Sequence, residues 1–167
     1  MSVRTGDRTE GKLQVLNKVR ELKKYSLDRV KTFPKSTRWL YAAPIAEEIR
    51  VAAICIRHAN AVYISKEYTA DYKYRHGEQI KAHSSLDALL DLIDDAYDAG
   101  YISGDQVNYW TGLILQTDDL LKAWIKSDFE KKKMIAFYEN MEVNYNAKHG
   151  LLETPCKSGG GSNETKI

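Results

Sequence analysis

The sequence predicts an all-α protein, an antiparallel up-down-up-down four-helix bundle with a flexible N-terminal segment and a C-terminal tail. Apolar residues recur every three or four positions through most of residues 12–130, which is the period of helices that bury one face. No stretch shows the alternation of a half-buried strand, and the links between helical stretches are short, as in an up-down bundle. The expected organisation is a flexible segment at 1–11, a bundle at 12–130 with helices at about 12–33, 37–64, 78–99 and 103–130, and a partly disordered extension at 131–167.

The first two helices each carry a continuous apolar stripe. In the first helix the stripe runs from Val15 to Phe33 in steps of three or four and includes one polar residue, Ser26. Pro34 ends this helix, because it has no N–H and disfavours helical geometry in the preceding residue. Pro44 is expected in the first turn of the second helix or at a kink. The stripe of the second helix consists of Ala42, Ile45, Ile49, Ala52, Ile56, Ala59 and Tyr63.

The last two helices follow a polar, tyrosine-rich connector at about residues 65–76. Gly100 suits the C-cap of the third helix, and Ser103 with Gln106 forms an S-x-x-Q capping box for the fourth. The aspartates of the third helix are expected on its exposed face. The residues that this helix is expected to turn inward are Ile80, Leu86, Leu90, Ile93 and Tyr97.

Other residue types that often carry chemistry are interpreted as structural. Trp110 and Trp124 lie on the stripe of the fourth helix and are expected in the core. For Trp39, burial at the corner between the first two helices is favoured over contact with a partner. The interior is expected to hold only apolar residues and small polar ones such as Ser26 and Thr117. No E-x-x-H pair of a di-iron site and no zinc-ligand spacing occurs, so we expect no metal and no cofactor. The histidines, expected to be exposed polar residues, are His58, His76, His83 and His149.

The totals describe one domain, whereas the charge is unevenly distributed along the chain. The 167 residues are 43% hydrophobic, which is enough for a core, and the formal net charge is only +2. Residues 12–38 carry nine Lys or Arg against Glu21 and Asp28, whereas residues 86–99 carry five Asp and no basic residue. This separation predicts distinct basic and acidic surfaces.

The sequence also favours a cytoplasmic protein without a membrane-spanning segment. The polar N-terminus has no apolar signal core, and the longest apolar run, Val51–Ile56, is too short to cross a bilayer. Cys55 and Cys156 lie far apart in dissimilar surroundings, so they predict no disulfide framework.

Basic residues of the first two helices form the candidate binding site. Arg20, Lys24 and Lys31 step by four and seven positions, opposite the apolar stripe. Few acidic residues accompany them, although a solvent-facing helix usually mixes signs to gain ion pairs. The balancing anion could be RNA or DNA, or the acidic face of another subunit, or the charge could simply be solvated. The candidate nucleic-acid-binding or partner-binding residues are Arg20, Lys23, Lys24, Lys31, Lys35, Arg38, Arg50 and Arg57.

Four short features together resemble a known family of four-helix bundles. They are KTFPKSTR after the first helix, the small-residue second helix, AYDAGYIS before the fourth helix and LLKAWIK near its end. The family includes the proteins encoded in intervening sequences of 23S ribosomal RNA genes, and Avd, the accessory variability determinant of diversity-generating retroelements. The resemblance covers about residues 12–130 and favours Avd.

The resemblance implies a protein that is not an enzyme. Avd proteins are homopentamers that bind the reverse transcriptase and template RNA of the retroelement and support mutagenic cDNA synthesis, while the polymerase supplies the chemistry. The chain departs from the family on its third helix, which has Asp94 and Asp95 where members often carry Arg. Nucleic-acid contact is therefore expected on the first two helices, where part of the basic surface would come from Arg20, Lys24, Lys31, Lys35 and Arg38.

Two alternatives stay open. One is a self-assembling structural bundle of the intervening-sequence type, in which the charge serves contacts between subunits. The other is a small helical ribonuclease, a class that pairs Arg and His on one helix. In this chain Arg50 and His58, and likewise Arg75 and His83, are separated by seven residues, which is too far for that pairing.

Overall fold

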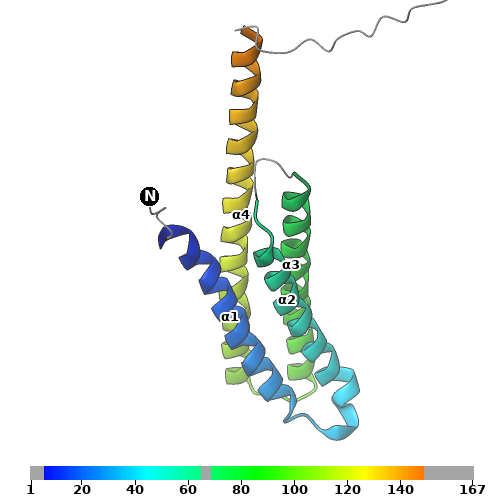
Figure 1. Ribbon diagram of the computed structural model, residues 1–167. Coiled ribbons are helices and arrows are strands. Elements are labelled where there is room, and N and C mark those ends of the chain that lie inside the picture. Colours follow the sequence, from blue (N-terminus) through cyan, green and yellow to red (C-terminus); the bar gives the residue numbers. More distant parts are fainter. Residues whose placement is uncertain (1–5, 65–68, 149–167) are drawn as a thin grey trace, which may run out of the picture. The chain divides into compact units, whose positions relative to one another are not determined.

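The computed structural model describes residues 6–64 and 69–148. Within these residues the protein is all-helical, with four α-helices and no strand, which confirms the all-α class and the predicted number of helices (Figure 1). The helix α2 packs against both α1 and α3, and side chains of α4 contact α1 and α3. The elements are α1 (Gly6–Val30), the 3₁₀ turn η1 (Lys35–Thr37), the π-helical turn η2 (Arg38–Ala42), α2 (Ala43–Ala61), α3 (Thr69–Asp98) and α4 (Gly104–Lys148).

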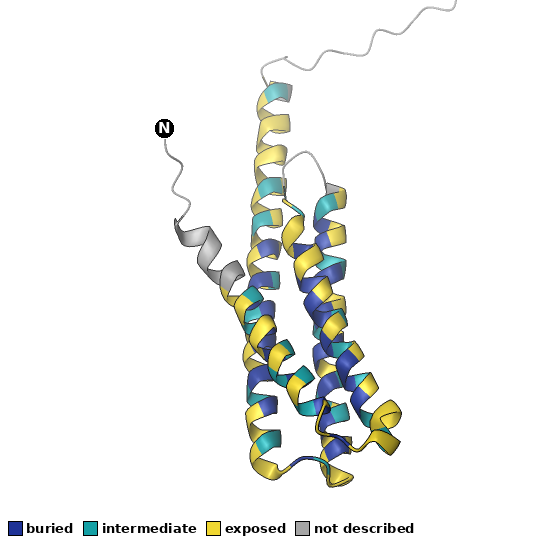
Figure 2. Ribbon diagram, turned by 60° about the horizontal axis from the view of Figure 1, so that its bottom comes forward, coloured by how far each residue is buried: buried dark blue, intermediate teal, exposed yellow. Residues whose placement is uncertain are grey.

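The stripes of α1 and α2 form much of the core, as their periodicity predicts. Figure 2 shows the buried residues along the sides of the helices that face one another. In the first stripe, Val15, Ser26 and Phe33 are buried as predicted. In the second stripe, every predicted residue is buried except Tyr63, which is 72% exposed. Tyr63 follows the end of α2, so the helical period no longer fixes the direction of its side chain.

The one polar residue in the α1 stripe has a specific partner in the core. The indole Nε1–H of Trp110 on α4 donates to Ser26 Oγ at 2.8 Å, and both residues are fully buried. The ring of Tyr25 meets the ring of Trp110 edge to face at 5.6 Å between centroids. A buried indole N–H needs an acceptor, so a serine here both fits the stripe and ties α1 to α4.

The turn between α1 and α2 is built around its two prolines. Pro34 follows α1 as expected, and Pro44 lies in the first turn of α2. A proline lacks the N–H of the normal helical bond and its ring crowds the carbonyl four residues before it. The chain before Pro44 accordingly widens to a π-helical turn, in which the Ala43 N–H donates to the Arg38 carbonyl.

The junction between α3 and α4 has the predicted caps. Gly100 has φ of +75°, its N–H donates to the Tyr97 carbonyl at 2.8 Å, and the Tyr101 N–H donates to the Ala96 carbonyl at 3.0 Å. This is the Schellman pattern of a helix C-terminus. The Ser103 N–H donates to Gln106 Oε1 at 3.0 Å and the Gln106 N–H to Ser103 Oγ at 3.4 Å, so the capping box is confirmed.

Several helix boundaries differ from the prediction. The helix α2 begins at Ala43 instead of residue 37, because residues 38–42 form the π-helical turn, and α1 and α2 each end three residues early. The helix α1 begins at Gly6 instead of residue 12, and no proline lies in the intervening segment to prevent it. The expected connector at 65–76 is largely helical, because α3 begins at Thr69 and buries Tyr72 and Arg75, whose packing stabilises turns that look polar in the sequence. The helix α4 continues from the predicted end at residue 130 to Lys148. The prediction of a flexible tail beyond this point lies outside the described residues.

The predicted inward face of α3 is right in the middle of the helix and wrong at its ends. Leu86 and Ile93 are buried and Leu90 packs against the core, whereas Ile80 and Tyr97 are 46% and 48% exposed. A search for apolar residues misses the start of the true stripe because two of its first members are polar. The stripe consists of Arg75, Gln79, Ala82, Leu86, Leu89, Ile93 and Ala96.

Trp39 was also predicted incorrectly, since its side chain is 73% exposed. It lies in η2, outside a regular α-helix, where the period of α2 does not apply. Trp110 and Trp124 are buried as predicted.

The contacts divide the chain after Lys132 into two units. The described part of the second unit, residues 133–148, is helical and carries several exposed apolar side chains. They are Met134, Phe137, Tyr138, Met141, Val143 and Tyr145. Across the described ranges, no helix combines the length and the apolar character needed to cross a bilayer.

Candidate nucleic-acid interface

The basic residues of α1 form a row on its solvent face. At about 100° per residue, Arg20, Lys24 and Lys31 fall within an arc of about 40°. All three are exposed, while Lys23 lies beside the row and is half-buried. The geometry of α1 therefore brings four of the predicted residues to neighbouring positions on one helix.

Two residues of this row have weak local partners. Lys31 Nζ lies 2.8 Å from Asp28 Oδ1, and Arg20 Nη1 lies 3.3 Å from Asn17 Oδ1. Exposed ion pairs of this kind contribute only about 0–1 kcal/mol, so a phosphate can compete for the ammonium group. The hydrogen bond from Lys31, with its charge and those of Lys24 and Arg29, lowers the pKa of the Asp28 carboxyl below its usual value.

Arg38 has a structural role that the sequence does not reveal. Its Nε donates to the Phe33 carbonyl at 3.2 Å and its Nη2 donates to the Lys31 carbonyl at 3.0 Å. The guanidinium therefore satisfies carbonyl groups just beyond the C-terminus of α1, which favours a positive charge. The prediction that Arg38 binds a partner stays a prediction, but its removal would also disturb the turn.

The remaining predicted residues extend the basic surface from η1 onto α2. Lys35 is exposed in η1, and Arg50 and Arg57 lie seven positions apart, which places them on one face of α2. Arg50 is only 3.9 Å from Glu47, a long surface pair. We define the basic surface as the eight residues Arg20, Lys23, Lys24, Lys31, Lys35, Arg38, Arg50 and Arg57. Within the described residues, its members without any ion pair are Arg20, Lys23, Lys24, Lys35, Arg38 and Arg57.

The five aspartates in the second half of α3 are exposed, as predicted from their position opposite the apolar stripe. They lie on a helix that packs against α2, whereas the basic surface runs over α1, η1 and α2. The chain therefore carries a separate acidic face, composed of Asp87, Asp91, Asp94, Asp95 and Asp98.

The interior contains a charged network that sequence reasoning missed. Arg75 Nε and Nη2 donate to the two carboxylate oxygens of Asp128 at 2.6 and 3.0 Å, and Arg75 Nη1 donates to the Val62 carbonyl at 2.9 Å. Gln79 also donates to Asp128 at 2.9 Å, and the guanidinium lies 4.7 Å from the centre of the Trp124 ring. The expectation of an interior with only apolar and small polar residues is therefore wrong.

The signal for this network is present in the sequence but ambiguous. Arg75 and Gln79 share one face of α3 and continue its apolar stripe, and Asp128 follows Trp124 by one turn on α4. Polar residues at such positions usually face solvent, so their burial needs the partner helix to be known. Burial of Arg75 also removes it from any phosphate at the surface, contrary to what the ribonuclease alternative requires of an Arg75–His83 pair.

A groove lies between α3 and α4, apart from the basic surface. This solvent-open groove of about 620 Å³ is bounded by apolar and aromatic side chains and by three lysines of α4. Lys132 Nζ lies 4.7 Å from the centre of the Tyr72 ring. The charged and imidazole side chains of the groove are His76, His83, Lys122, Lys126 and Lys132.

The basic surface is suited to binding a polyanion, since its cationic groups are exposed and few of them are neutralised locally. In comparisons with protein-family models, with curated proteins and with solved structures, no match to this chain was found.

Proposed function

We propose that the chain is a non-catalytic accessory protein of a diversity-generating retroelement, an adaptor that binds template RNA and the reverse transcriptase. The observation that carries the RNA part is the basic surface itself, in which exposed Lys24, Lys35 and Arg57 have no ion pair within the described residues. Each phosphate that such a group neutralises releases condensed counterions, which favours binding at low and moderate salt.

The resemblance to Avd supports the rest of the proposal. It favours a cytoplasmic homopentamer of up-down-up-down bundles, with the polymerase as the protein partner. The short junction between α3 and α4 supports this helix order.

The second unit offers a candidate surface for a protein partner. Met134, Tyr138, Met141 and Tyr145 are exposed and step by four, three and four along α4, which places them on one helical face. A row of exposed methionine and aromatic side chains at this spacing is typical of a helix that binds in a groove of another protein.

A double charge reversal tests the RNA part directly. Lys24→Glu with Lys35→Glu should weaken binding of a mixed-sequence single-stranded RNA about tenfold or more at low salt, measured by fluorescence anisotropy. Both residues are exposed and make no hydrogen bond within the described structure, so the helical content should not change.

The matched control reverses two exposed lysines elsewhere, Lys73→Glu on α3 with Lys126→Glu on α4. It carries the same total charge, so an equal loss of binding would show that RNA responds to net charge and not to the basic surface. Unchanged RNA binding by the Lys24 and Lys35 variant would refute the proposed interface.

Self-assembly of a structural bundle is the second candidate, and the acidic face of α3 favours it. The basic surface of one subunit could contact the acidic face of the next, a head-to-tail contact that forms a ring when its rotation closes. In that case the mass in solution, measured by light scattering, should fall as salt rises, and the purified protein should retain no nucleic acid.

A further inference from the structure

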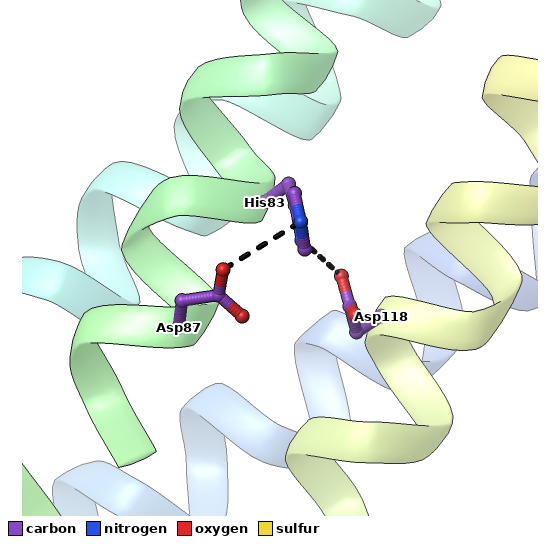
Figure 3. Close-up of side chains that lie close together, drawn as sticks. All are labelled: His83, Asp87 and Asp118. Carbon is purple, nitrogen blue, oxygen red and sulfur yellow. Dashed lines mark hydrogen bonds and ion pairs between the residues drawn. The ribbon is translucent and has the colours of Figure 1, made fainter. Parts of the chain in front are cut away.

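His83 on α3 is held by a buried carboxylate on α4. Its Nδ1 lies 2.6 Å from Asp118 Oδ1, and the Asp118 side chain is only 6% exposed (Figure 3). An ionised carboxylate only accepts hydrogen bonds, so Nδ1 is the nitrogen that donates. In the neutral imidazole, Nε2 is then left with a free lone pair.

The free nitrogen faces a second carboxylate on the same helix. His83 Nε2 and Asp87 Oδ2 are 3.6 Å apart, which is too long for a hydrogen bond, and Figure 3 shows the imidazole lying between Asp87 and Asp118. With neutral imidazole, both facing atoms are acceptors, an arrangement that becomes favourable when Nε2 carries a proton or when a metal cation lies between them. His83 and Asp87 are one helical turn apart, so α3 itself sets this separation.

The separation matches two ligands of one metal ion. Zinc bonds of about 2.0–2.2 Å to nitrogen and oxygen, at a tetrahedral angle, place the ligand atoms about 3.4 Å apart. A carboxylate that accepts from the other ring nitrogen is the usual support of a metal-binding histidine, and Asp118 provides it here. His83, Asp87 and Asp118 each offer a ligand atom within 4.8 Å of the others.

The local charge favours a cation even though one lysine is present. Lys122 Nζ lies 2.7 Å from Asp118 Oδ2, and this bond, with the charges of Asp118, Asp87 and Asp119, raises the pKa of the lysine amine. Asp87, Asp118 and Lys122 give −2 + 1 = −1 around a neutral imidazole. His83 and Lys122 both line the groove between α3 and α4, so an ion can reach the imidazole from solvent.

We propose that His83 Nε2 and the Asp87 carboxylate bind a divalent transition metal of the zinc class, with Asp118 as the positioning residue behind the imidazole. Two side chains leave the remaining coordination positions to water. An imidazole ligand selects zinc, copper, nickel or cobalt over magnesium and calcium, which prefer oxygen. This proposal does not depend on RNA binding by the basic surface.

Isothermal titration of the purified, chelator-treated full chain with zinc tests the proposal. The wild type should bind one more zinc ion per chain than the His83→Gln variant. The Asp87→Asn variant should bind this ion at least about tenfold more weakly than the wild type. Asp118→Asn should also weaken it, about 10- to 100-fold, because the imidazole loses the carboxylate that orients it. Magnesium, titrated under the same conditions, should give no binding at this site.

Two controls separate this site from other zinc ligands on the chain. Asp91→Asn changes an exposed carboxylate one turn further along α3. Cys55→Ser removes a buried thiol next to Glu78. Neither substitution should change the zinc affinity of the His83 site more than about twofold. Asp87 is exposed, so its substitution should leave the unfolding midpoint in place. The proposal is overturned if His83→Gln or Asp87→Asn binds zinc with the stoichiometry and affinity of the wild type.

Discussion

The side chains of Arg75 and Asp128 form an ion pair that is almost completely removed from water, at 2% and 1% exposure. Burial alone lowers the pKa of the Arg75 guanidinium, and the charge and hydrogen bonds of Asp128 oppose that effect. Such a pair contributes little to stability relative to apolar residues of the same shape, but either member alone is costly to bury. Its main effect here is to fix which face of α3 meets α4.

Removal of the Asp128 carboxylate should therefore destabilise the fold strongly. Asp128→Ala leaves the guanidinium of Arg75 without its counter-ion and should lower the free energy of unfolding by about 3–5 kcal/mol, measured by urea denaturation. Arg75→Met combined with Asp128→Leu removes both charges and should recover much of the loss. A single variant that loses less than about 1 kcal/mol would contradict the buried pair.

Glu78 should give the protein a specific sensitivity to acid. The hydrogen bond from Lys81 at 2.8 Å, followed by those from His58 and Cys55, lowers the pKa of the Glu78 carboxyl below its ordinary value of 4.5. A lowered folded-state pKa stabilises the fold above pH 4.5, and this contribution is lost as pH falls through the lowered value.

Glu78→Gln should accordingly be less stable than the wild type at pH 6, and the difference should shrink as the solution is acidified below pH 4.5. Urea midpoints across this range measure the effect. Glu47→Gln changes an exposed carboxylate on α2. Its urea midpoint should follow that of the wild type across the same pH range. A gap between wild type and Glu78→Gln that stays constant with pH would contradict the assignment.

At the scale of single elements, helical periodicity identified α1 and α2 because their stripes are apolar nearly throughout. On α3 it placed Leu86 and Ile93 correctly but failed in the first turns, where Arg75 and Gln79 belong to the buried stripe and exposed Ile80 lies outside it. The sequence alone cannot show that a polar residue will meet Asp128 from another helix. Local cap chemistry was more reliable, since Gly100 and Ser103 act through neighbours in the chain.

Alanine substitutions at two glycines should change the stability of the fold in opposite directions, which tests where α3 ends. Gly100→Ala should destabilise the fold by about 1–2 kcal/mol, because φ of +75° is strained for a residue with a Cβ. Gly77→Ala, inside α3, should stabilise it by about 0.5–1 kcal/mol. An added Cβ meets no atom within 4 Å at either position, so the backbone alone decides the sign. Thermal unfolding measures both, and equal signs would contradict the assigned helix end.

At the scale of the whole molecule, the net charge of +2 conceals a basic surface on α1, η1 and α2 and an acidic face on α3. The sequence predicted this separation, because runs of like charge need no tertiary information. It did not predict that Arg38 caps the end of α1, that Lys31 pairs with Asp28, or that His83 meets Asp118. These contacts depend on turn geometry, on rotamers and on a second helix, so they required the structure.

The salt dependence of RNA binding tests the central claim most directly, because it counts phosphate contacts. The logarithm of the association constant should fall linearly with the logarithm of the salt concentration between about 50 and 200 mM, with a slope of about −0.7 for each contact to single-stranded RNA. Lys24→Gln should reduce the magnitude of that slope by about 0.7, and Lys73→Gln should leave it unchanged. A slope that is identical in the wild type and in Lys24→Gln, or RNA binding too weak to measure at 50 mM salt, would contradict direct contact between the basic surface and RNA.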